Sequence, residues 1–318
     1  MKDKENELTL FKEEQKDLMA YMPSPFIVAA LPTRAVKNVP FVRNYNGLKL
    51  TLSGVNQVPY GKNGRLLLTI LTTHAVLSKN QDDNNNVVIN YKSIKQLLDE
   101  LQLPTSRTNE IKEQLEYFSK SAFIFEQKKT KNVKKIYFKD LFDEEDYYEM
   151  PEEVTATAKS TGNIPFFENM SSLEIEDSAG DKKSVAFSIT LSPQFTRYSR
   201  KHSVPINYTI YKSISSPIGK DLYAWFIYRN NGLAENENVF IPMSSLVEQF
   251  MPVKEGSVKT QERTNYDYLK TQILQIKSKY YPDLNVSFRK DGTGMDLYKS
   301  KPQINSDDQR YVLVTSDL

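Results

Sequence analysis

Apolar residues recur with helical spacing in two stretches of the chain, and each stretch ends in positions of alternating polarity. In the first stretch, the continuous apolar run Gly64–Lys79 predicts a core helix, and Val87–Asn90 predicts a short strand. A capping box, formed by Ser93 and Gln96, indicates the start of a second helix over Ile94–Leu101. This stretch therefore begins with a helix, a strand and a helix.

A third helix and a hairpin complete the first stretch. The helix is predicted to begin near Ser106–Thr108, and apolar residues at i, i+4 and i+7 from Ile111 give it one buried face. Period-two alternation then predicts two short strands around Phe123 and Ile136. The polar segment Lys128–Lys135 lies between them, so we expect a hairpin with a basic tip.

The second stretch repeats this order of helix, short strand, helix, longer helix and hairpin. Ser216 and Pro217 give it a strong start, because serine is a good N-cap and proline suits the first helical turn. The elements predicted after Ser216 are Pro217–Arg229 (helix), Val239–Ile241 (strand), Ser245–Phe250 (helix capped by Ser244), Arg263–Lys279 (helix), and a hairpin around Val286 and Met295.

Helix, strand, helix, helix and hairpin is the element order of a winged helix-turn-helix domain. The sequence therefore predicts an α+β protein with tandem winged helix-turn-helix domains joined by an acidic linker. We expect that linker to be mostly irregular. The predicted segments are an N-terminal amphipathic and extended segment (1–40), a first winged-helix domain (41–142), the acidic linker (143–180), a second winged-helix domain (181–302) and a C-terminal tail (303–318).

The formal net charge of +2 hides a segregated distribution of charge along the chain. Residues 121–140 carry a net charge of +4, residues 181–230 carry +6 and residues 254–301 carry +4, whereas residues 141–180 carry −10. Two modules that each bind a polyanion would produce this pattern. Two solvated domains with a polar linker would produce it as well.

Several classes of chemistry lack the residues that they need. The chain has no cysteine, only two histidines (His74 and His202), and neither a GxxxxGK[ST] nor a GxGxxG motif. We therefore expect a non-enzymatic protein with no catalytic residues, no metal and no cofactor. No apolar run approaches the roughly 18 residues of a membrane span, and no secretion signal is present, so we expect a cytoplasmic protein without a membrane partner.

Double-stranded DNA is the polyanion that this fold prediction favours. A DNA-binding winged helix inserts its third helix into the major groove and touches backbone phosphate with its hairpin. Tyr60 and Arg65 have an alternative role, which is to pack and cap the first helix. The predicted DNA-binding residues are Tyr60, Lys62, Arg65, Ser106, Arg107, Thr108, Asn109, Lys112, Lys128, Lys129, Lys131, Lys134, Lys135, Lys259, Arg263, Asn265, Lys270, Arg289 and Lys290.

An ordered set of short motifs resembles RepA-type plasmid-encoded replication initiators. The segment Tyr60–Leu68, followed by Leu71-Thr72-Thr73, is similar to the "PYG…RLLL…LTT" signature of that family. Further similar motifs follow in order: Ile111–Phe118, Leu191–Phe195, Val204-Pro205, Ser216-Pro217, Asp221–Trp225, Tyr228-Arg229, Tyr281-Pro282 and Ser300–Pro302.

This resemblance implies binding to repeated sequences at a plasmid origin, opening of the duplex, and recruitment of host replication proteins such as the replicative helicase or its loader. The family often has Gly and Arg ahead of the third helix, where this chain has Thr105–Asn109, so the preferred DNA sequence is not carried over. Monomer and homodimer both remain open as the active form. A transcriptional regulator on the same fold, and a protein-interaction scaffold that does not bind DNA, are the alternative functions.

Overall fold

The computed structural model of the chain describes residues 19–45, 48–78, 86–137, 147–176, 182–251 and 258–304. Within these ranges, residues 127–137, 147–162, 174–176, 182–185 and 258–262 are described by their backbone alone. The predicted N-terminal amphipathic segment up to residue 18, and the tail from residue 305, lie outside the described residues.

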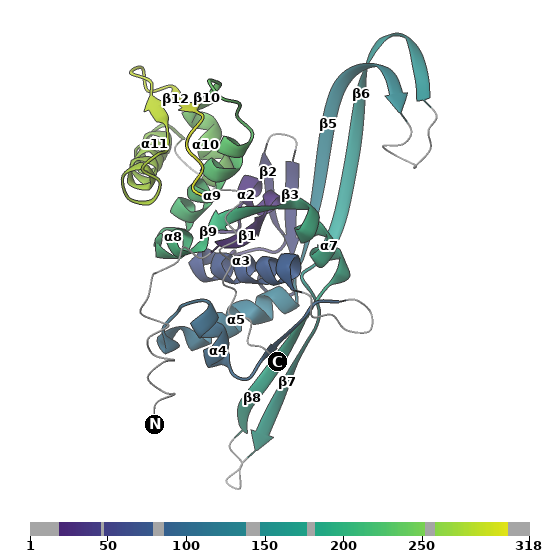
Figure 1. The fold of residues 1–318 in the computed structure, drawn as a ribbon, viewed down its shortest axis with the longest axis vertical. Helices are drawn as coiled ribbons and strands as arrows, with labels where there is room; N and C mark the ends of the chain where they lie inside the picture. Colours follow the sequence, from purple (N-terminus) through teal and green to yellow (C-terminus); the bar gives the residue numbers. More distant parts are fainter. Residues whose placement is uncertain are drawn as a thin grey trace, which may run out of the picture.

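The first half of the chain combines a helical layer with short strands and one long hairpin (Figure 1). Its elements are β1 (Met19–Pro23), α2 (Ser24–Ala29), β2 (Phe41–Tyr45), β3 (Leu48–Ser53), α3 (Gly61–Leu77), β4 (Val88–Tyr91), α4 (Ile94–Glu100), the 3-10 turn η1 (Thr105–Arg107), α5 (Thr108–Ser119), β5 (Ala122–Tyr137) and β6 (Tyr147–Pro165).

The second half begins with another hairpin and ends in a small helical unit with its own sheet. Its elements are β7 (Phe167–Glu176), β8 (Lys182–Leu191), α7 (Pro193–His202), β9 (Ser203–Asn207), α8 (Tyr208–Ser213), α9 (Pro217–Asn231), β10 (Asn238–Pro242), α10 (Met243–Phe250), α11 (Val258–Gln275), the π-helical turn η2 (Ile276–Tyr280), β11 (Val286–Phe288) and β12 (Gly294–Tyr298).

Local capping signals fix several helix starts where the sequence predicts them. The Ser93 side chain accepts a hydrogen bond from the backbone N–H of Gln96, and Ser216 accepts one from Gly219. In the predicted capping box, the Gln96 side chain accepts from the backbone N–H of Lys92 rather than from that of Ser93. The predicted Ser244 cap is wrong, because α10 begins at Met243 without a side-chain cap.

The second half contains a three-stranded sheet that joins the predicted short strand to the predicted hairpin. Strand β12 lies between β10 and β11, and both of these pairs are antiparallel. Gly294 lies opposite Pro242, and a Cβ at Gly294 would lie 2.3 Å from the carbonyl oxygen of Ile241. A side chain at this position is therefore incompatible with the observed strand spacing.

The first half departs from that arrangement. Strand β4 pairs with β8, in the sheet order β4-β8-β7, instead of joining the hairpin that follows α5. The hairpin strands β5 and β6 belong to a different sheet, in the order β2-β3-β5-β6. The structure therefore shows a mixed arrangement of helices and small antiparallel sheets, and the predicted repeat of one domain is only partly visible in it.

The segment that the sequence predicts to be an irregular acidic linker is built of strands. Tyr147–Pro165 pairs with β5, and Phe167–Glu176 pairs with β8. The predicted boundary at residue 180 falls between the two strands of the β7–β8 hairpin. The prediction was wrong because acidic composition indicates solvation, whereas backbone pairing along two neighbouring strands satisfies the peptide groups whatever the charge of the side chains.

The prediction that Lys128–Lys135 forms the tip of a hairpin is also wrong. Lys128–Lys135 lies inside the continuous strand β5, which extends to Tyr137, and the segment that joins β5 to β6 is residues 138–146, outside the described residues. The polar composition of Lys128–Lys135 suggested a turn because a run of polar residues lacks the apolar alternation by which strands are recognised.

A single buried apolar cluster extends through both halves of the chain. Residues of α2 belong to it, with the Phe26 ring 5.0 Å from that of Phe123 and 6.0 Å from that of Phe166. Across the halves, the Gln249 side chain donates to the carbonyl of Val28 at 2.7 Å. Residues 19–31, which belong to the predicted N-terminal amphipathic and extended segment, are therefore part of the core.

Candidate nucleic-acid interface

Arg65, a predicted DNA contact, is a buried structural residue. Its side chain is 1% exposed, and its Nε and Nη2 donate to the two carboxylate oxygens of Asp221 at 2.7 and 2.6 Å. Its remaining N–H groups donate to the carbonyls of Leu31, Pro32 and Gly61 at 2.6–2.9 Å. All five donors are thus used inside the protein, and we withdraw Arg65 as a DNA contact in this conformation.

The residues around Arg65 attach α3 to α5. The backbone N–H of Tyr60 donates to Gln114 Oε1 at 2.9 Å, and the Asn63 side chain donates to Glu110. A Cβ at Gly64 would lie 2.8 Å from Gln114 Oε1, so glycine permits this close approach. The "PYG…R" signature is architectural here, which is the alternative that the sequence left open for Tyr60 and Arg65.

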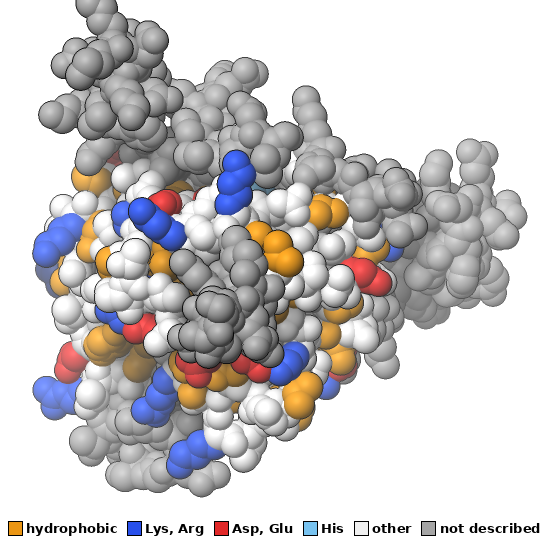
Figure 2. All heavy atoms as spheres, turned by 90° about the horizontal axis from the view of Figure 1, so that it is seen from below, with side chains coloured by type: hydrophobic (Ala, Val, Ile, Leu, Met, Phe, Trp, Pro, Cys, Tyr) orange, Lys and Arg blue, Asp and Glu red, His pale blue; other side chains and the backbone are white. Residues whose placement is uncertain are grey.

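The start of α5 presents its predicted DNA-binding residues at the surface, together with acids. Ser106, Asn109 and Lys112 are exposed, whereas Arg107 and Thr108 are partly exposed. The guanidinium of Arg107 is ion-paired with Glu110. The face of the molecule seen in Figure 2, from the side of α4 and α5, accordingly shows basic, acidic and apolar side chains interspersed.

Further along α5, acids continue to offset bases. Lys120 pairs with Glu116 at 2.6 Å, and the Tyr117 hydroxyl donates to Glu113 at 2.5 Å. Three glutamates, at positions 110, 113 and 116, therefore lie on the helix that the sequence predicts to read DNA. Lys62, in the first turn of α3, is partly exposed.

Among its described side chains, helix α11 carries two exposed bases and one exposed acid, Asp267. Arg263 and Lys270 are exposed, and the ammonium of Lys270 lies 5.4 Å from the centroid of the Phe288 ring, so this helix face adjoins strand β11. Asn265, in contrast, is only 7% exposed. It faces the core, and we therefore withdraw it as a base-reading residue. Lys259 belongs to α11, but its side chain is not described.

The hairpin of β11 and β12 holds Arg289 in one orientation. The Arg289 guanidinium donates two hydrogen bonds to Asp296, at 2.9 and 3.1 Å, and its central carbon lies 3.8 Å from the centroid of the Phe240 ring. Lys290 is exposed beside it. Sequence reasoning missed Phe240 and Asp296 as supports for Arg289, because these contacts cross from one strand to the next.

The lysines at positions 128, 129, 131, 134 and 135 are brought together along one strand, at some distance from α11 and its hairpin (Figure 1). The structure therefore separates the predicted DNA-binding residues into three surface groups, on α5, on α11 with its hairpin, and on β5.

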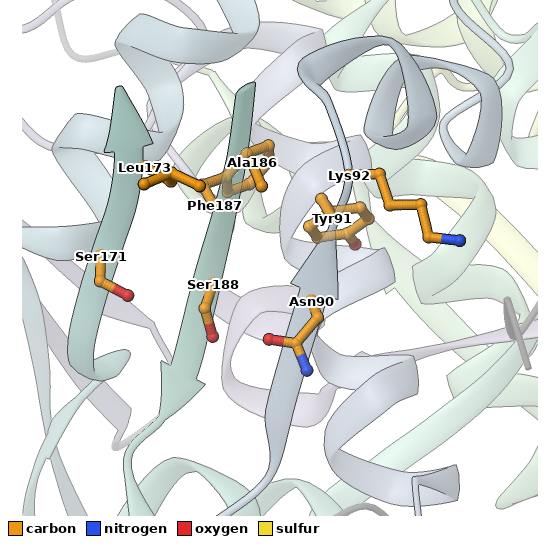
Figure 3. Close-up of a pocket in the computed structure, with 8 residues that line it drawn as sticks. All are labelled: Asn90, Tyr91, Lys92, Ser171, Leu173, Ala186, Phe187 and Ser188. Atoms are coloured by element: carbon orange, nitrogen blue, oxygen red, sulfur yellow. The ribbon is translucent and has the colours of Figure 1, made fainter. Parts of the chain in front are cut away.

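A shallow hollow lies apart from these groups, on the sheet of β4, β8 and β7 (Figure 3). Its volume is about 240 Å³, and Tyr91 and Phe187 stack beside it with ring centroids 5.0 Å apart. The remaining lining residues are Asn90, Lys92, Ser171, Leu173, Ala186 and Ser188. Small polar and apolar side chains dominate this surface, so it suggests no particular chemistry.

Within the described residues, no helix combines the length and apolar character that crossing a bilayer requires. Among the same residues, no three side chains of metal-binding type are grouped together. The expectations that the protein is not an enzyme and needs no metal remain predictions.

No family model matches the chain, and no curated protein matches its sequence. Among solved structures, it is similar to the crystal structure of RctB domains 2-3, with a TM-score of 0.45, 12% identity, and coverage of 86% of this chain and 94% of that chain. A selenomethionine derivative of domains 2 and 3 of RctB gives a TM-score of 0.46, 12% identity, and coverage of 88% and 99%. At this identity and TM-score, the likeness carries no functional argument, and membership of the RepA-type family stays a prediction.

Proposed function

We propose that this chain is a non-enzymatic plasmid replication initiator that binds origin DNA sequence-specifically. In this proposal the second half is a winged-helix unit, helix α11 enters the major groove, and the β11–β12 hairpin touches the adjacent backbone. The proposed protein works in the cytoplasm, helps to open the duplex, and recruits host replication proteins such as the replicative helicase or its loader.

The observation that carries the proposal is the group of exposed bases on α11 and its hairpin. Arg263, Lys270, Arg289 and Lys290 are all exposed on two adjoining elements, where Asp267 and Asp291 are exposed as well. The order of elements in this unit, with a helix, a strand, two helices and a hairpin, supports a winged helix. Exposed bases near a helix of this kind favour a polyanion over an apolar protein partner. The ordered RepA-like motifs support an origin as the target, because they extend over most of the chain.

The difference in ion pairing makes α11 the principal reading helix of the proposal. Arg263 and Lys270 form no ion pair among the described residues, although Asp267 is exposed between them. On α5 and the residues that flank it, Arg107 and Lys120, three bases face three glutamates, and two of those bases are paired with them. A helix surface with equal numbers of both charges gains little from approaching phosphate. We therefore assign α5 a secondary contact, made through Ser106, Asn109 and Lys112.

The test is selection of binding sites from random duplexes by the full-length chain. We expect enrichment of a defined sequence, and we expect Arg263→Ala to cost about 1–3 kcal/mol on the selected duplex and much less on random duplex. Asn109→Ala, on α5, is the matched comparison and is expected to cost less than Arg263→Ala.

Origin activity needs a separate measurement, since a transcriptional regulator would pass the binding test. A circular DNA that carries only this gene and its flanking sequence should replicate in a bacterial host, and its copy number should fall when Arg263 is replaced by Ala. Failure of the full-length chain to bind any duplex at low salt would refute the proposal and favour the protein-interaction scaffold.

A further inference from the structure

The hairpin of β5 and β6 continues well beyond the sheet that supports its base (Figure 1). From Ala122 to Gln127, strand β5 pairs with β3 on one edge and with β6 on the other. From Lys128 onward, its only described neighbour is β6. The outer part is therefore a two-stranded ribbon, and such ribbons are marginally stable in water without a partner.

An irregularity divides this ribbon into two parts with different charge. Val133 pairs with Val154 and Lys135 pairs with Glu149, so four residues, Met150–Glu153, are inserted opposite a single residue. We call the inner part, residues 128–133 and 154–159, the ribbon stem. The stem contains Lys128, Lys129, Lys131 and Lys159 and no acid, whereas the acids Glu149, Glu152 and Glu153 lie outside it.

The positions of these lysines suggest an anion on both faces of the stem. Lys128 lies directly opposite Lys159, an arrangement of like charges that destabilises a strand pair. Because successive strand residues alternate between faces, positions 129 and 131 belong to the other face, opposite Ala158 and Ala156. Each face of the stem thus combines two lysine positions with small residues. A polyanion on each face would remove the repulsion between the lysines.

The groove of a duplex presents a phosphate backbone on either side of an inserted element. The major groove, about 12 Å wide, admits a two-stranded ribbon, whereas the minor groove, about 6 Å wide, does not without deformation. Six residues of strand extend over about 17 Å, which is about half a turn of the double helix. Small residues such as Thr155, Ala156 and Ala158 permit close approach of the backbone.

We propose that the ribbon stem lies in the major groove of duplex DNA, with its two lysine-bearing faces toward the two phosphate backbones. The proposal rests on the proposed function, because it assumes that this chain binds duplex DNA. It adds a second, sequence-independent contact, which reaches DNA outside the segment read by α11.

The first experiment measures the salt dependence of binding to a 40-bp mixed-sequence duplex by fluorescence anisotropy, with the full-length chain. Replacing the four stem lysines by Gln should lower the slope of log K against log salt by up to about 0.9 for each phosphate that the variant no longer neutralises. The matched control removes four exposed charges elsewhere, at Arg34, Lys37, Lys92 and Lys95, and should leave the slope unchanged. Circular dichroism and thermal unfolding confirm that both variants are folded.

The second experiment locates the stem on DNA and does not depend on the stability of a charge variant. The natural chain has no cysteine, so Thr130→Cys introduces a unique attachment point for an iron–EDTA cleavage reagent in the stem. We expect cleavage of the bound duplex from position 130, and its loss on a duplex whose major groove is filled by glucosylated 5-hydroxymethylcytosine. Ser171→Cys, on the exposed face of strand β7, is the control and should give no cleavage.

The outcomes separate this inference from the proposed function. If the wild-type chain binds duplex but the stem variant keeps the same salt slope, or position 130 gives no cleavage, the ribbon inference is wrong and the proposed function stands. Cleavage that survives glucosylation would place the stem outside the major groove and also overturn it. A stem variant that changes the oligomeric state in ultracentrifugation, with unaltered DNA binding, would overturn it too and identify the ribbon as a contact between copies.

Discussion

The pair formed by Arg65 and Asp221 connects α3 in the first half of the chain to α9 in the second. Both side chains are almost fully buried, at 1% and 5% exposure, and the guanidinium makes five hydrogen bonds. A buried pair of this kind adds little net stability compared with apolar residues of similar size, but the loss of one partner leaves a buried charge uncompensated.

We predict that Arg65→Met lowers the free energy of unfolding by about 3–5 kcal/mol, because it leaves the Asp221 carboxylate buried without its partner. The double variant Arg65→Met/Asp221→Leu should lose less than the two single variants together. Urea unfolding, followed by the fluorescence of Trp225, the only tryptophan, measures the free energy of unfolding of the single and double variants. A single variant with wild-type stability and weaker DNA binding would instead restore Arg65 as a phosphate contact.

Lys220, next to Asp221, is a buried amine whose charge is disfavoured. Burial lowers the pKa of Lys220 to about 7, and the neighbouring cations Arg65 and Lys62 contribute to this lower pKa, whereas Asp221 raises it. The amine donates to the carbonyls of Tyr211 and Lys212.

The unfolded chain, in which lysine has its ordinary pKa of about 10.4, binds more protons than the folded chain between pH 7 and 10. Stability should therefore rise with pH from 7 to 9, and Lys220→Met should flatten that rise. Urea unfolding at pH 6.5, 7.5, 8.5 and 9 measures the slope, with exposed Lys95→Met as the control. An identical slope in Lys220→Met and the wild-type chain would show that Lys220 stays charged in the fold.

At the residue scale, the sequence shows which side chains could bind DNA, but it shows less well which of them are exposed. It distinguishes Arg65 and Asn265 as polar residues near predicted recognition helices, but both are buried. Their burial depends on which helices pack together, and for Arg65 the partner lies 156 positions away. Exposed candidates such as Arg263 and Lys290 were placed correctly at the surface, because their neighbours along the helix or hairpin already face the core.

At the element scale, the β11–β12 hairpin contains two glycines that serve different purposes. Gly292 has a φ of 73°, and a Cβ at this position would have no atom within 4 Å, whereas a Cβ at Gly294 would lie 2.3 Å from the carbonyl oxygen of Ile241 and 2.7 Å from the Phe240 ring. Gly292 allows a left-handed backbone conformation, and Gly294 allows strands β10 and β12 to pair closely.

We predict that Gly292→Ala costs about 1–2 kcal/mol of unfolding free energy, which is the ordinary cost of a left-handed conformation. Gly294→Ala should cost more, because the contacting carbonyl is backbone and cannot turn aside, and it should also displace Phe240 from Arg289. Thermal unfolding ranks the two variants, and anisotropy with a mixed-sequence duplex detects displacement of the hairpin. Equal losses of unfolding free energy in the two variants would mean that β10 and β12 separate easily.

Helices and their caps were predictable because their signals are local. The starts of α4 and α9 follow from Ser93 and Ser216, and the buried face of α5 follows from apolar spacing. The pairing of strands was less predictable. Nothing near Val88–Tyr91 indicates that its partner is β8, about 100 positions later, and the polar run Lys128–Lys135 in the middle of β5 lacks the alternation that reveals a strand.

At the scale of the whole molecule, the halves do not behave as two modules on a free linker. One apolar cluster includes residues of both, and the side chain of Arg43 donates to the carbonyl of Met251 at 3.0 Å, across the two halves. A cut between Glu153 and Asn163 would fall within β6. Two domains on an irregular linker, as the sequence predicts, would remain folded after such a cut, and this packing does not support that outcome.

We predict that both halves unfold in one cooperative transition, because neither can lose its structure without exposing the shared core. Trp225 reports on the second half, and a dye on Ser106→Cys reports on the first, since the chain has no other cysteine. The two urea transitions should coincide. Separate midpoints, or a fragment 181–318 with a cooperative transition of its own, would establish independent domains.

The pairing of β1 with β9 has a consequence for how the chain is made. Met19 pairs with Asn207, so the first strand of the fold has no partner until 188 further residues have been synthesised. At about 5–20 residues per second, that interval lasts about 10–40 s. During it the backbone of Met19–Pro23 lacks the strand that pairs with it in the fold, and its protection by a chaperone or by the nascent α3 region determines how much of the newly synthesised protein escapes aggregation.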